Sequence, residues 1–319
     1  MSITQKLKKG AAWTLGRALP IQKNKVVFSS FYGRGASDNP KAIVDALAQR
    51  PEKLDIVWLA KDPAHAGVPD NVRVVPYDTP AAIRELSTAR VWVDNCRKGA
   101  HVKKDGQYYM QTWHGFALKR IERDVADKLN TPENAAYAEY AKRDSAQIDA
   151  IISNSTFMTE IYQKSFWYHG AVLEYGSARN DILVHPPADA KHQVQQALHL
   201  PNDCQIIMYA PTFRADHSLD AYQLDYQAVC RACAQRFGGN WVMLVRLHPN
   251  VMKLAKDLKF DNQTTFDATS VDDMQLLLAG CDAVITDYSS LMFDFALTRR
   301  PCFQFAMDID AYKGDRNFY

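Results

Sequence analysis

Short apolar, β-rich runs alternate with helix-patterned segments along most of the chain, and this alternation limits the fold more than any other feature. Strands separated by helices pair in parallel, because each helix carries the chain back before the next strand begins. A parallel sheet is covered on both faces, so its strands read as nearly continuous apolar runs. The predicted class is therefore α/β, with two doubly wound parallel-sheet domains facing a central cleft.

The element pattern also predicts where the domains divide. Strands are predicted at residues 25–31, 55–60, 72–77, 89–95, 108–113, 150–155, 205–210, 241–247, 264–267, 282–286 and 301–305. Helices are predicted at 40–49, 80–86, 222–237 and 271–279. A length of 319 residues suits two domains, and the sequence turns polar after Gly176, with Pro186 and Pro187 close by. We expect an N-terminal segment at 1–20 and domains at 21–175 and 176–319.

Composition excludes several classes of protein. The chain is 47% hydrophobic and 23% charged, which is ordinary for a folded globular protein. Its net charge of only +2 argues against a nucleic-acid partner. The six cysteines are scattered, and Cys230 and Cys233 lack a second pair at zinc spacing, which favours buried or surface thiols in a reducing, cytosolic setting.

The N-terminal segment is basic and amphipathic. No apolar run of 18 residues occurs, so no transmembrane span is predicted, and the N-terminus lacks the long apolar core of a secretory signal. Lys6, Lys8, Lys9 and Arg17 alternate with apolar residues. This pattern fits a surface helix packed on the protein body, and it equally fits a helix at an anionic bilayer surface.

Polar residues follow several predicted strands of the second domain. Ser289 and Ser290 form a turn after the strand at 282–286, with Asp294 one turn into the next helix. Hydroxyls and backbone N–H groups at such a turn can bind phosphate, although simple helix capping explains the same residues.

Two further strand ends and the proposed hinge carry charge. Arg246 and His248 alternate after the strand at 241–247, and therefore share a face. Thr212 and Arg214 follow the strand at 205–210, and Arg179 lies at the hinge. Together these residues suit a nucleoside diphosphate whose phosphates are neutralised by side chains.

In the first domain, Trp113-His114-Gly115 follows the predicted strand at 108–113. His114 is either a turn residue or a general base at a cleft. There is no Walker-type phosphate loop, and Asp308-Ile309-Asp310 is interpreted as a surface turn rather than a metal motif. No cofactor and no metal site are therefore predicted.

Taken together, five motifs resemble the CDP-glycerol glycerophosphotransferase family, the teichoic-acid primases and polymerases and related capsule enzymes. They occur in the family's order over residues 113–294. The motifs are Trp113-His114-Gly115, Gly176-Ser177-Ala178-Arg179-Asn180-Asp181, Ala210-Pro211-Thr212-Phe213-Arg214, Arg246-Leu247-His248-Pro249 and Thr286-Asp287-Tyr288-Ser289-Ser290-Leu291-Met292-Phe293-Asp294.

The resemblance implies a bacterial enzyme with a GT-B-like pair of domains that transfers glycerol phosphate from CDP-glycerol. A metal-independent transfer is predicted, because side chains and a helix end are available to neutralise the phosphate charge. It implies an undecaprenyl-diphosphate-linked saccharide acceptor and a peripheral location at the cytoplasmic face of the cell membrane. His114 and His248 are implied as catalytic residues. The implied donor-binding residues are Trp113, Gly115, Arg179, Thr212, Phe213, Arg214, Arg246, Leu247, Ser289, Ser290 and Asp294.

The chain also departs from the family pattern. Phe116 and Ala117 replace a frequent Thr-Pro pair, which predicts an altered acceptor fit, and Ala178 replaces a frequent proline. Relatives usually continue beyond Tyr319, so a shortened C-terminal domain is expected. The lack of a long N-terminal extension favours primase-like single addition over polymerisation. The alternatives are a nucleotide-sugar glycosyltransferase of the same fold, a ribitol-phosphate transferase of the same family, and a catalytically silent membrane-peripheral protein.

Overall fold

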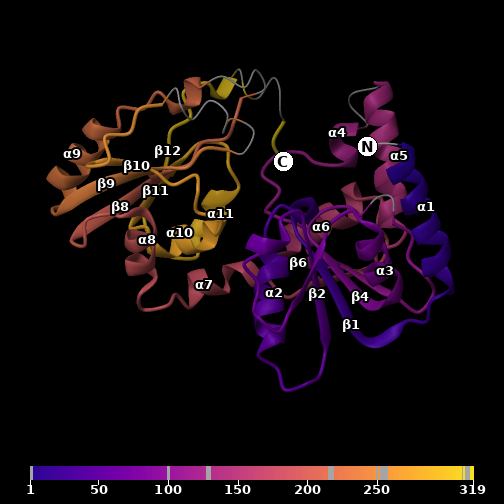
Figure 1. Ribbon diagram of the computed structural model, residues 1–319. Helices are drawn as coiled ribbons and strands as arrows, with labels where there is room; N and C mark the ends of the chain where they lie inside the picture. The colour runs from indigo at the N-terminus through magenta and orange to yellow at the C-terminus, as the bar shows by residue number, and fades with distance from the viewer. Residues whose placement is uncertain are drawn as a thin grey trace. The chain divides into compact units, whose positions relative to one another are not determined.

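The computed structural model of the chain describes residues 3–98, 101–126, 131–214, 219–248, 251, 258–310, 312 and 317–319, with side chains described from residue 9 onward. Lys6 and Lys8 of the N-terminal segment therefore lie outside the described side chains. The chain divides into two compact units (Figure 1). The first contains the chain up to His114 and Ile121–Arg179, and the second contains Gly115–Arg120 and the chain from Asn180.

The first unit is a helix-covered parallel sheet. Its strands are β1 (Gln22–Ser29), β2 (Asp55–Ala60), β3 (Arg73–Pro76), β4 (Ala89–Asp94), β5 (Tyr108–Gln111), β6 (Ala150–Ser153) and β7 (Ala171–Glu174). Its helices are α1 (Ile3–Ala18), α2 (Asp38–Ala48), α3 (Pro80–Thr88), α4 (Arg123–Ala126), α5 (Pro132–Ser145) and α6 (Thr156–Ser165).

The strand order of this sheet is β3-β2-β1-β4-β5-β6-β7, and every pairing is parallel. The chain builds outward from β1 to β3 and then returns to place β4 on the other side of β1. The order therefore reverses between β1 and β4. In open α/β sheets, ligands bind at the carboxyl ends of the strands at this point.

The second unit repeats the design with fewer strands. Its elements are α7 (Asp181–Val184), α8 (Ala190–Leu198), β8 (Cys204–Tyr209), α9 (Tyr226–Phe237), β9 (Asn240–Val245), β10 (Thr265–Asp267), α10 (Met274–Gly280), β11 (Ala283–Thr286), α11 (Leu291–Ala296) and β12 (Cys302–Gln304). The strand order is β10-β9-β8-β11-β12, all parallel, so the reversal falls between β8 and β11.

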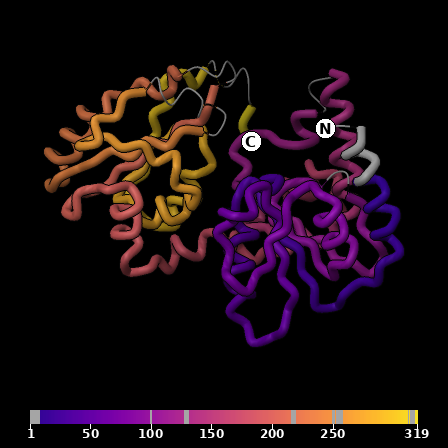
Figure 2. Tube along the Cα trace, in the orientation of Figure 1, coloured from indigo at the N-terminus to yellow at the C-terminus, as the bar shows by residue number. Residues whose placement is uncertain are grey.

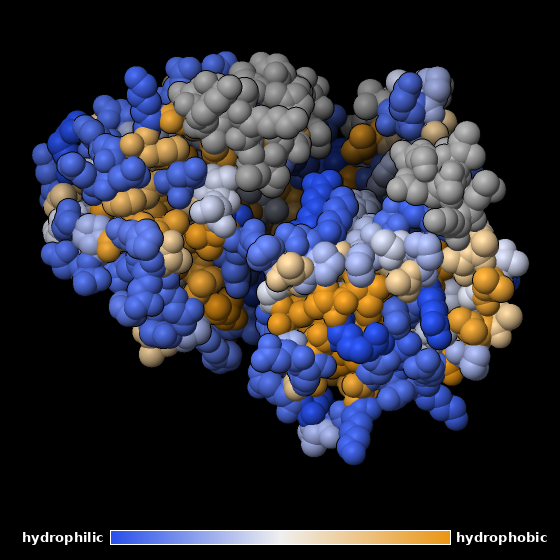
Figure 3. All heavy atoms as spheres, in the orientation of Figure 1, coloured by the Kyte–Doolittle hydropathy of each residue, from blue (hydrophilic) through white to orange (hydrophobic). Residues whose placement is uncertain are grey.

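Alternate residues along β8 belong to two different cores. Ile206 and Met208 pack with α8, α10 and α11, whereas Ile207 and Tyr209 pack with α9 on the opposite face. Figure 1 shows α8, α10 and α11 on one side of this sheet and α9 on the other. Both faces are thus covered by helices, which explains the continuous apolar runs in the sequence. Figure 2 traces the same two units, and Figure 3 shows a mainly hydrophilic visible surface with smaller apolar areas.

The fold confirms the predicted α/β class with two parallel sheets. Each predicted strand and helix overlaps an observed element, with ends shifted by a few residues. The sequence predicts no strand over Ala171–Glu174, where the structure has β7, because the residues of this strand are only half-buried to exposed. The compact units divide after Arg179, compared with the predicted division after residue 175.

α1 packs on the body of the first unit. Trp13 lies against the ring of His101, with 5.1 Å between centroids, and Lys9 pairs with Asp78 at 2.5 Å. Leu15 of this helix is 69% exposed to solvent. Among the described residues, no helix combines the length and apolar character needed to cross a bilayer.

Candidate active site

A buried ion pair closes the carboxyl end of the first sheet where its strand order reverses. Asp94, the last residue of β4, accepts the hydroxyl of Ser29 from β1 and pairs with Lys98 at 2.7 Å. Lys98 also donates to the Ser29 hydroxyl at 2.6 Å. The Asp94 and Lys98 side chains are 3% and 1% exposed, so this ion pair is sealed from solvent.

His114 lies three residues beyond the end of β5 and is linked to this ion pair through Asn95. Its Nδ1 is 2.5 Å from the backbone oxygen of Asn95, which directly follows Asp94. A carbonyl oxygen can only accept, so Nδ1 carries the proton of the neutral imidazole. Nε2 then keeps its lone pair, and a half-buried histidine in this tautomer can take a proton from a substrate hydroxyl.

The turn that carries His114 is held by amide side chains. Trp113 has a left-handed backbone with φ of 52°, which is unfavourable for a bulky residue. Its N–H donates to Oε1 of Gln111 at 2.9 Å, and its carbonyl accepts from Nδ2 of Asn39 at 3.3 Å. The Trp113 and His114 rings stack with 4.4 Å between centroids. These contacts fix an otherwise strained turn.

Arg179 lies in the first unit, whereas the sequence grouped it with the residues of the second domain. Its guanidinium pairs with Asp38, the first residue of α2, at 2.6 Å, and both side chains are less than 10% exposed. Its backbone N–H donates to Oδ1 of Asn39 at 3.1 Å. Asn39 thereby connects the hinge to the Trp113 turn, so Arg179 belongs to the surroundings of His114.

The second sheet also places an aspartate at its reversal point. Asp287 directly follows β11, and its Oδ1 accepts from the N–H and hydroxyl of Thr212, both at 2.8 Å. Its Oδ2 accepts from Nη1 of Arg214 at 2.8 Å. Thr212 and Arg214 follow β8, the neighbouring strand. The structure therefore brings two predicted donor-binding residues together around a carboxylate that the sequence did not single out.

Arg214 is held on a second side by Asp308. Nε and Nη2 of Arg214 donate to the two carboxylate oxygens of Asp308 at 2.7 and 3.0 Å. The guanidinium also lies 5.3 Å from the ring centroids of both Tyr288 and Tyr312. Burial raises the pKa of Asp308, but bonds from Arg214 and Tyr288 outweigh it and hold that pKa below 3.8. Asp308, interpreted from the sequence as part of a surface turn, is thus an ion-pair partner.

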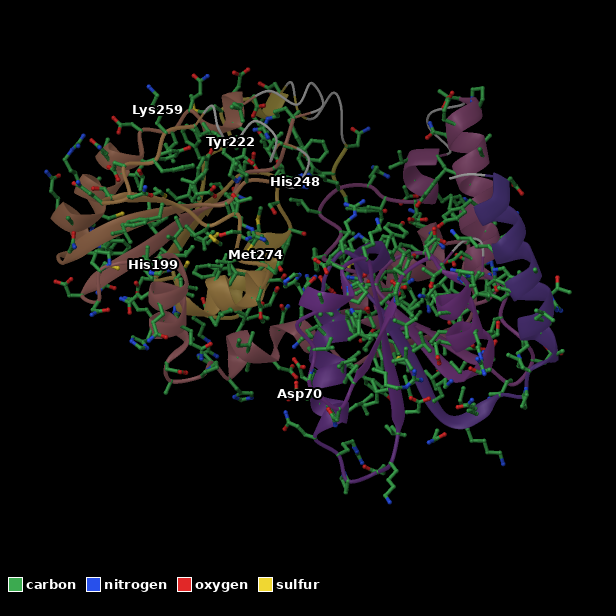
Figure 4. All side chains as sticks on the ribbon, viewed as in Figure 1. Asp70, His199, Tyr222, His248, Lys259 and Met274 are labelled. Atoms are coloured by element: carbon green, nitrogen blue, oxygen red, sulfur yellow. The ribbon has the colours of Figure 1, made fainter. Side chains whose placement is uncertain are left out.

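Arg246 and His248 are placed differently by β9. Arg246 donates through Nη1 to the backbone oxygens of Ala268, at 2.7 Å, and of Val271. Burial lowers the pKa of this guanidinium. The ring centroid of His248 lies 4.5 Å from that of Phe213. The backbone N–H of His248 donates to the hydroxyl of Tyr222, and Figure 4 labels His248 and Tyr222. Arg246 therefore braces the strand end, while His248 packs beside the loop after β8.

Leu247, between Arg246 and His248, is fully buried, so its side chain belongs to the core. The backbone N–H of Leu247 donates to the hydroxyl of Thr269 at 3.1 Å, which fixes the path of this loop. Pro249, the last residue of the motif, lies outside the described residues.

The serine turn leads into a short helix. Ser289 accepts the N–H of Leu291 at 3.3 Å, and Ser290 makes no side-chain cap bond. α11 has only six residues, so its helix dipole is weak. Asp294 is buried and accepts Nδ2 of Asn180 at 2.7 Å. Asp294 thus holds the start of the second unit against α11.

The segment Gly115–Arg120 belongs to the second unit although it follows His114 directly. Phe116 packs on Phe293 of α11 with 4.1 Å between ring centroids, and Ala117 is buried. Lys119 forms an antiparallel bridge with Phe318 and lies 5.1 Å from the ring centroid of Tyr312. Of the residues that depart from the family pattern, Phe116 therefore packs against α11 and Ala117 is buried, and Gly115 begins the segment that carries both.

With this geometry in place, comparison with known proteins is decisive. The model of the family described as CDP-Glycerol:Poly(glycerophosphate) glycerophosphotransferase matches residues 12–319. The chain belongs to this family.

Relatives in the family support the assignment. A teichoic acid poly(glycerol phosphate) polymerase of Staphylococcus epidermidis is 34% identical over 94% of this chain and 42% of its own length. A teichoic acid glycerol-phosphate transferase of Staphylococcus aureus is 32% identical over 93% of this chain and 78% of its own length. A teichoic acid ribitol-phosphate primase of Bacillus spizizenii is 26% identical. This chain spans about two fifths of the first relative and about four fifths of the second.

Solved structures agree with the family assignment. The wall teichoic acid polymerase TagF superposes with a TM-score of 0.84 at 31% identity, covering 100% of this chain and 83% of that chain. A TagF variant soaked with CDPG gives the same TM-score at 30% identity and the same coverage. The predicted GT-B-like class, with two parallel α/β sheets, is confirmed by this match.

Several residues that hold the predicted site residues were not predicted from the sequence, although one of them, Asp287, lies within a family motif. Asn39, Asn95 and Asp287 hold the motif residues but were not predicted as part of the site. Asn95 and Asp287 do follow apolar strands, so the rule used for Arg246 could have found them. Asn39 gave no such signal, because only the fold brings it to Trp113. Within the described part of the chain, no group of three or more metal-ligating side chains occurs.

Proposed function

We propose that this chain transfers glycerol phosphate from CDP-glycerol to a hydroxyl of a lipid-linked acceptor. The acceptor oxygen attacks the β-phosphorus of CDP-glycerol, the bond from that phosphorus to the bridging oxygen breaks, and CMP leaves with the oxygen. The hydroxyl proton passes to Nε2 of His114. Apart from this transfer, the reaction needs positioning and neutralisation of charge, as in other phosphoryl transfers.

The observation that carries this proposal is the hydrogen bond from Nδ1 of His114 to the Asn95 carbonyl. It leaves the acceptor nitrogen at Nε2, which is the state a general base needs before reaction. Family membership supplies the donor class, because the family description names CDP-glycerol. The TagF variant soaked with CDPG supports the same donor.

On the donor side, we assign phosphate binding to His248, Ser289 and Ser290 together with the outer face of Arg214. The Arg214 side chain is 14% exposed, so part of it can reach a ligand although Asp287 and Asp308 hold it. Arg246, Leu247, Thr212 and Asp294 act in this scheme by shaping the loops, because each is buried or bonded to protein groups. Phe213 packs on His248 and orients its ring.

In the first unit, Trp113 and Gly115 act through the backbone that presents His114. Arg179 acts through its pairing with Asp38 and Asn39. The scheme uses no metal ion; full activity in excess EDTA is expected, and loss of activity that returns with Mg²⁺ would contradict this part of the proposal.

We further propose that the acceptor is an undecaprenyl-diphosphate-linked saccharide at the cytoplasmic membrane surface. The exposed Leu15 on the basic helix α1 supports peripheral contact with a bilayer. Sedimentation with anionic and neutral vesicles tests it. Binding only to anionic vesicles, weakened in a Leu15→Glu variant, is expected; equal recovery without vesicles would exclude it.

The central experiment is mass spectrometry of products from a synthetic lipid-linked disaccharide incubated with CDP-glycerol or CDP-ribitol. Addition of glycerol phosphate with release of CMP is expected for the wild-type chain and not for His114→Ala. The number of units added distinguishes single addition from polymerisation. A product only from CDP-ribitol would move the proposal to the ribitol branch, which the ribitol-phosphate relatives make the specific second candidate.

Nucleotide preference separates this function from a nucleotide-sugar glycosyltransferase of the same fold. A ligand that binds the folded state and not the unfolded state raises the melting temperature, and the rise grows with the logarithm of ligand concentration above Kd. CDP and CMP are expected to stabilise the chain, and UDP and GDP are not. Stabilisation by UDP or GDP alone would overturn the proposal.

A further inference from the structure

Asn95 stands at the carboxyl end of β4, between the ion pair of Asp94 and the ring of His114. It is the first residue after the strand and is completely buried. Asp94 accepts the N–H of Cys96 at 2.8 Å through Oδ1, which holds the backbone around Asn95 immediately after the strand. This carbonyl accepts Nδ1–H of His114.

The side chain of Asn95 also acts on His114 indirectly, through a hydrogen bond to Phe31. Its Oδ1 accepts the N–H of Phe31 at 2.9 Å. The amide orientation is fixed by this bond, because an N–H donor requires the oxygen and not the NH₂ group. Phe31 and Tyr32 have left-handed φ values of 43° and 59°, which bulky side chains rarely adopt. The bond from Asn95 therefore holds a strained turn.

That turn places the Phe31 ring against His114. The two ring centroids are 5.5 Å apart with an interplanar angle of 63°, an edge contact. Trp113 stacks on the imidazole at 29°. The imidazole is thus bonded at Nδ1 by the Asn95 main chain and packed by a ring whose backbone the Asn95 side chain holds.

The amide nitrogen of Asn95, in contrast to the oxygen, holds no neighbouring group in the described part of the chain. Nδ2 of Asn95 is buried and has no hydrogen-bond partner among the residues that the structure describes. Unpaired buried donors are uncommon because they lose water without gaining a partner. An asparagine kept here at this cost is consistent with a requirement for its oxygen in the turn beside His114.

We propose that Asn95 is the positioning residue that sets the tautomer and orientation of His114. This inference rests on the proposed role of His114 as the base. The main-chain carbonyl selects the Nδ1–H tautomer, and the side chain keeps the Phe31 turn in place so that the ring stays on that carbonyl. A histidine released from the carbonyl can place its proton on Nε2, where the substrate hydroxyl needs an acceptor.

The test is ¹⁵N NMR of histidine-labelled protein at a pH where His114 is neutral, with its signals assigned by loss in His114→Gln. The wild type is expected to show Nδ1–H for His114. Asn95→Ala and Phe31→Ala are each expected to move the population toward Nε2–H. Asn95→Asp keeps an oxygen for the Phe31 N–H and is expected to retain the wild-type tautomer.

Kinetics give the second readout. Misplacing a base by about 1 Å costs on the order of 10- to 100-fold in rate, so kcat of Asn95→Ala should fall by this amount while KM for CDP-glycerol changes little. Asn71→Ala is the matched control, because it removes an amide that donates to Ala48 O at the other end of the first unit's strands. Its kcat should stay at the wild-type value.

The outcomes separate the two proposals. A wild-type chain that releases no CMP from CDP-glycerol refutes the proposed function, whatever the NMR shows. An active wild type whose Asn95→Ala variant keeps both kcat and the Nδ1–H signal refutes the positioning role alone. Where Asn95→Ala fails to fold, unchanged kcat and tautomer in Phe31→Ala refute it instead.

Discussion

The two sheets carry the same arrangement at the point where their strand order reverses. In the first, Asp94 after β4 bonds the hydroxyl of Ser29 and pairs with Lys98. In the second, Asp287 after β11 bonds the hydroxyl of Thr212 and pairs with Arg214. Each aspartate thus connects the two strands that flank the reversal, using one neutral donor and one cation.

The two clusters differ in how far the cation is open to solvent. Lys98 is 1% exposed and sealed, whereas Arg214 is 14% exposed and also bonded to Asp308, which is itself 40% exposed. The first cluster therefore stabilises the loop after β4, whose Asn95 carbonyl binds His114. The second cluster keeps part of a cation at the surface. A charge at a strand end is a ligand site only where its partners leave it accessible.

The largest expected effect separates the two units by function. His114→Ala should lower kcat on the order of 10²–10⁴-fold with CDP binding retained, because a general base acts on the reacting proton. His248→Ala should show a comparable loss of turnover together with weaker CDP binding. CMP release and calorimetric titration with CDP measure the two quantities.

His65→Ala is the matched control, since the His65 side chain is 83% exposed and pairs with the surface residue Asp62. Near-normal turnover of a folded His114→Ala variant would contradict the assignment of chemistry to the first unit.

The next effect compares the two aspartates by stability. Asp94→Ala leaves Lys98 buried without its carboxylate and should lower the free energy of unfolding by about 3–5 kcal/mol. Asp287→Ala leaves Arg214 paired with Asp308, so the loss should be nearer about 1–3 kcal/mol, the range for unpaired buried donors. Urea unfolding followed by fluorescence measures both. A greater loss in Asp287→Ala would reverse the contrast drawn between a sealed and an open pair.

The smallest effect concerns the exposed partner of Arg214 and its pH dependence. The pKa of Asp308 is depressed below 3.8, so its ionised form stabilises the fold above that pH, and this stability is lost as pH falls through the folded-state pKa. Because Asp308 is 40% exposed, Asp308→Asn should cost about 1 kcal/mol or less at neutral pH.

Urea unfolding of wild type and Asp308→Asn between neutral pH and pH 3 follows this difference. The two curves should converge in acid, where the wild-type carboxyl also becomes neutral. A difference that persists undiminished at the acid limit would assign the effect to packing and not to the ion pair.

The strands and helices were predictable because strands buried on both faces of a sheet appear in the sequence as continuous apolar runs. β2 was predicted with its observed bounds, since Ile56–Ala60 is a continuous apolar run between the charged residues Asp55 and Lys61. β7 was missed because Ala171–Glu174 is an edge strand with half-buried and exposed residues, which lacks that signal. Most motif residues were found because they follow a recognisable strand, and all of them match a family pattern.

The contacts of those residues were less predictable. Arg179, Arg214 and Arg246 looked alike in sequence, yet one pairs with Asp38, one with two aspartates and one with backbone carbonyls. These partners come from residues 22 to 141 positions away, and no local sequence pattern indicates such a pairing. The residue types predicted where positively charged side chains cluster, but not whether carboxylates or carbonyls of the protein already bind them.

The sequence by itself determined the alternation of strands and helices, the polar strand ends and the family motifs, because these depend on local patterning and burial. Only the tertiary structure decided that Asn95 and Phe31 meet at His114, and that the neutral imidazole therefore has its lone pair on Nε2. A tautomer is selected by the hydrogen bond at the opposite ring nitrogen. That partner is supplied by a neighbouring strand, so strand order in the sheet sets the chemistry of the histidine.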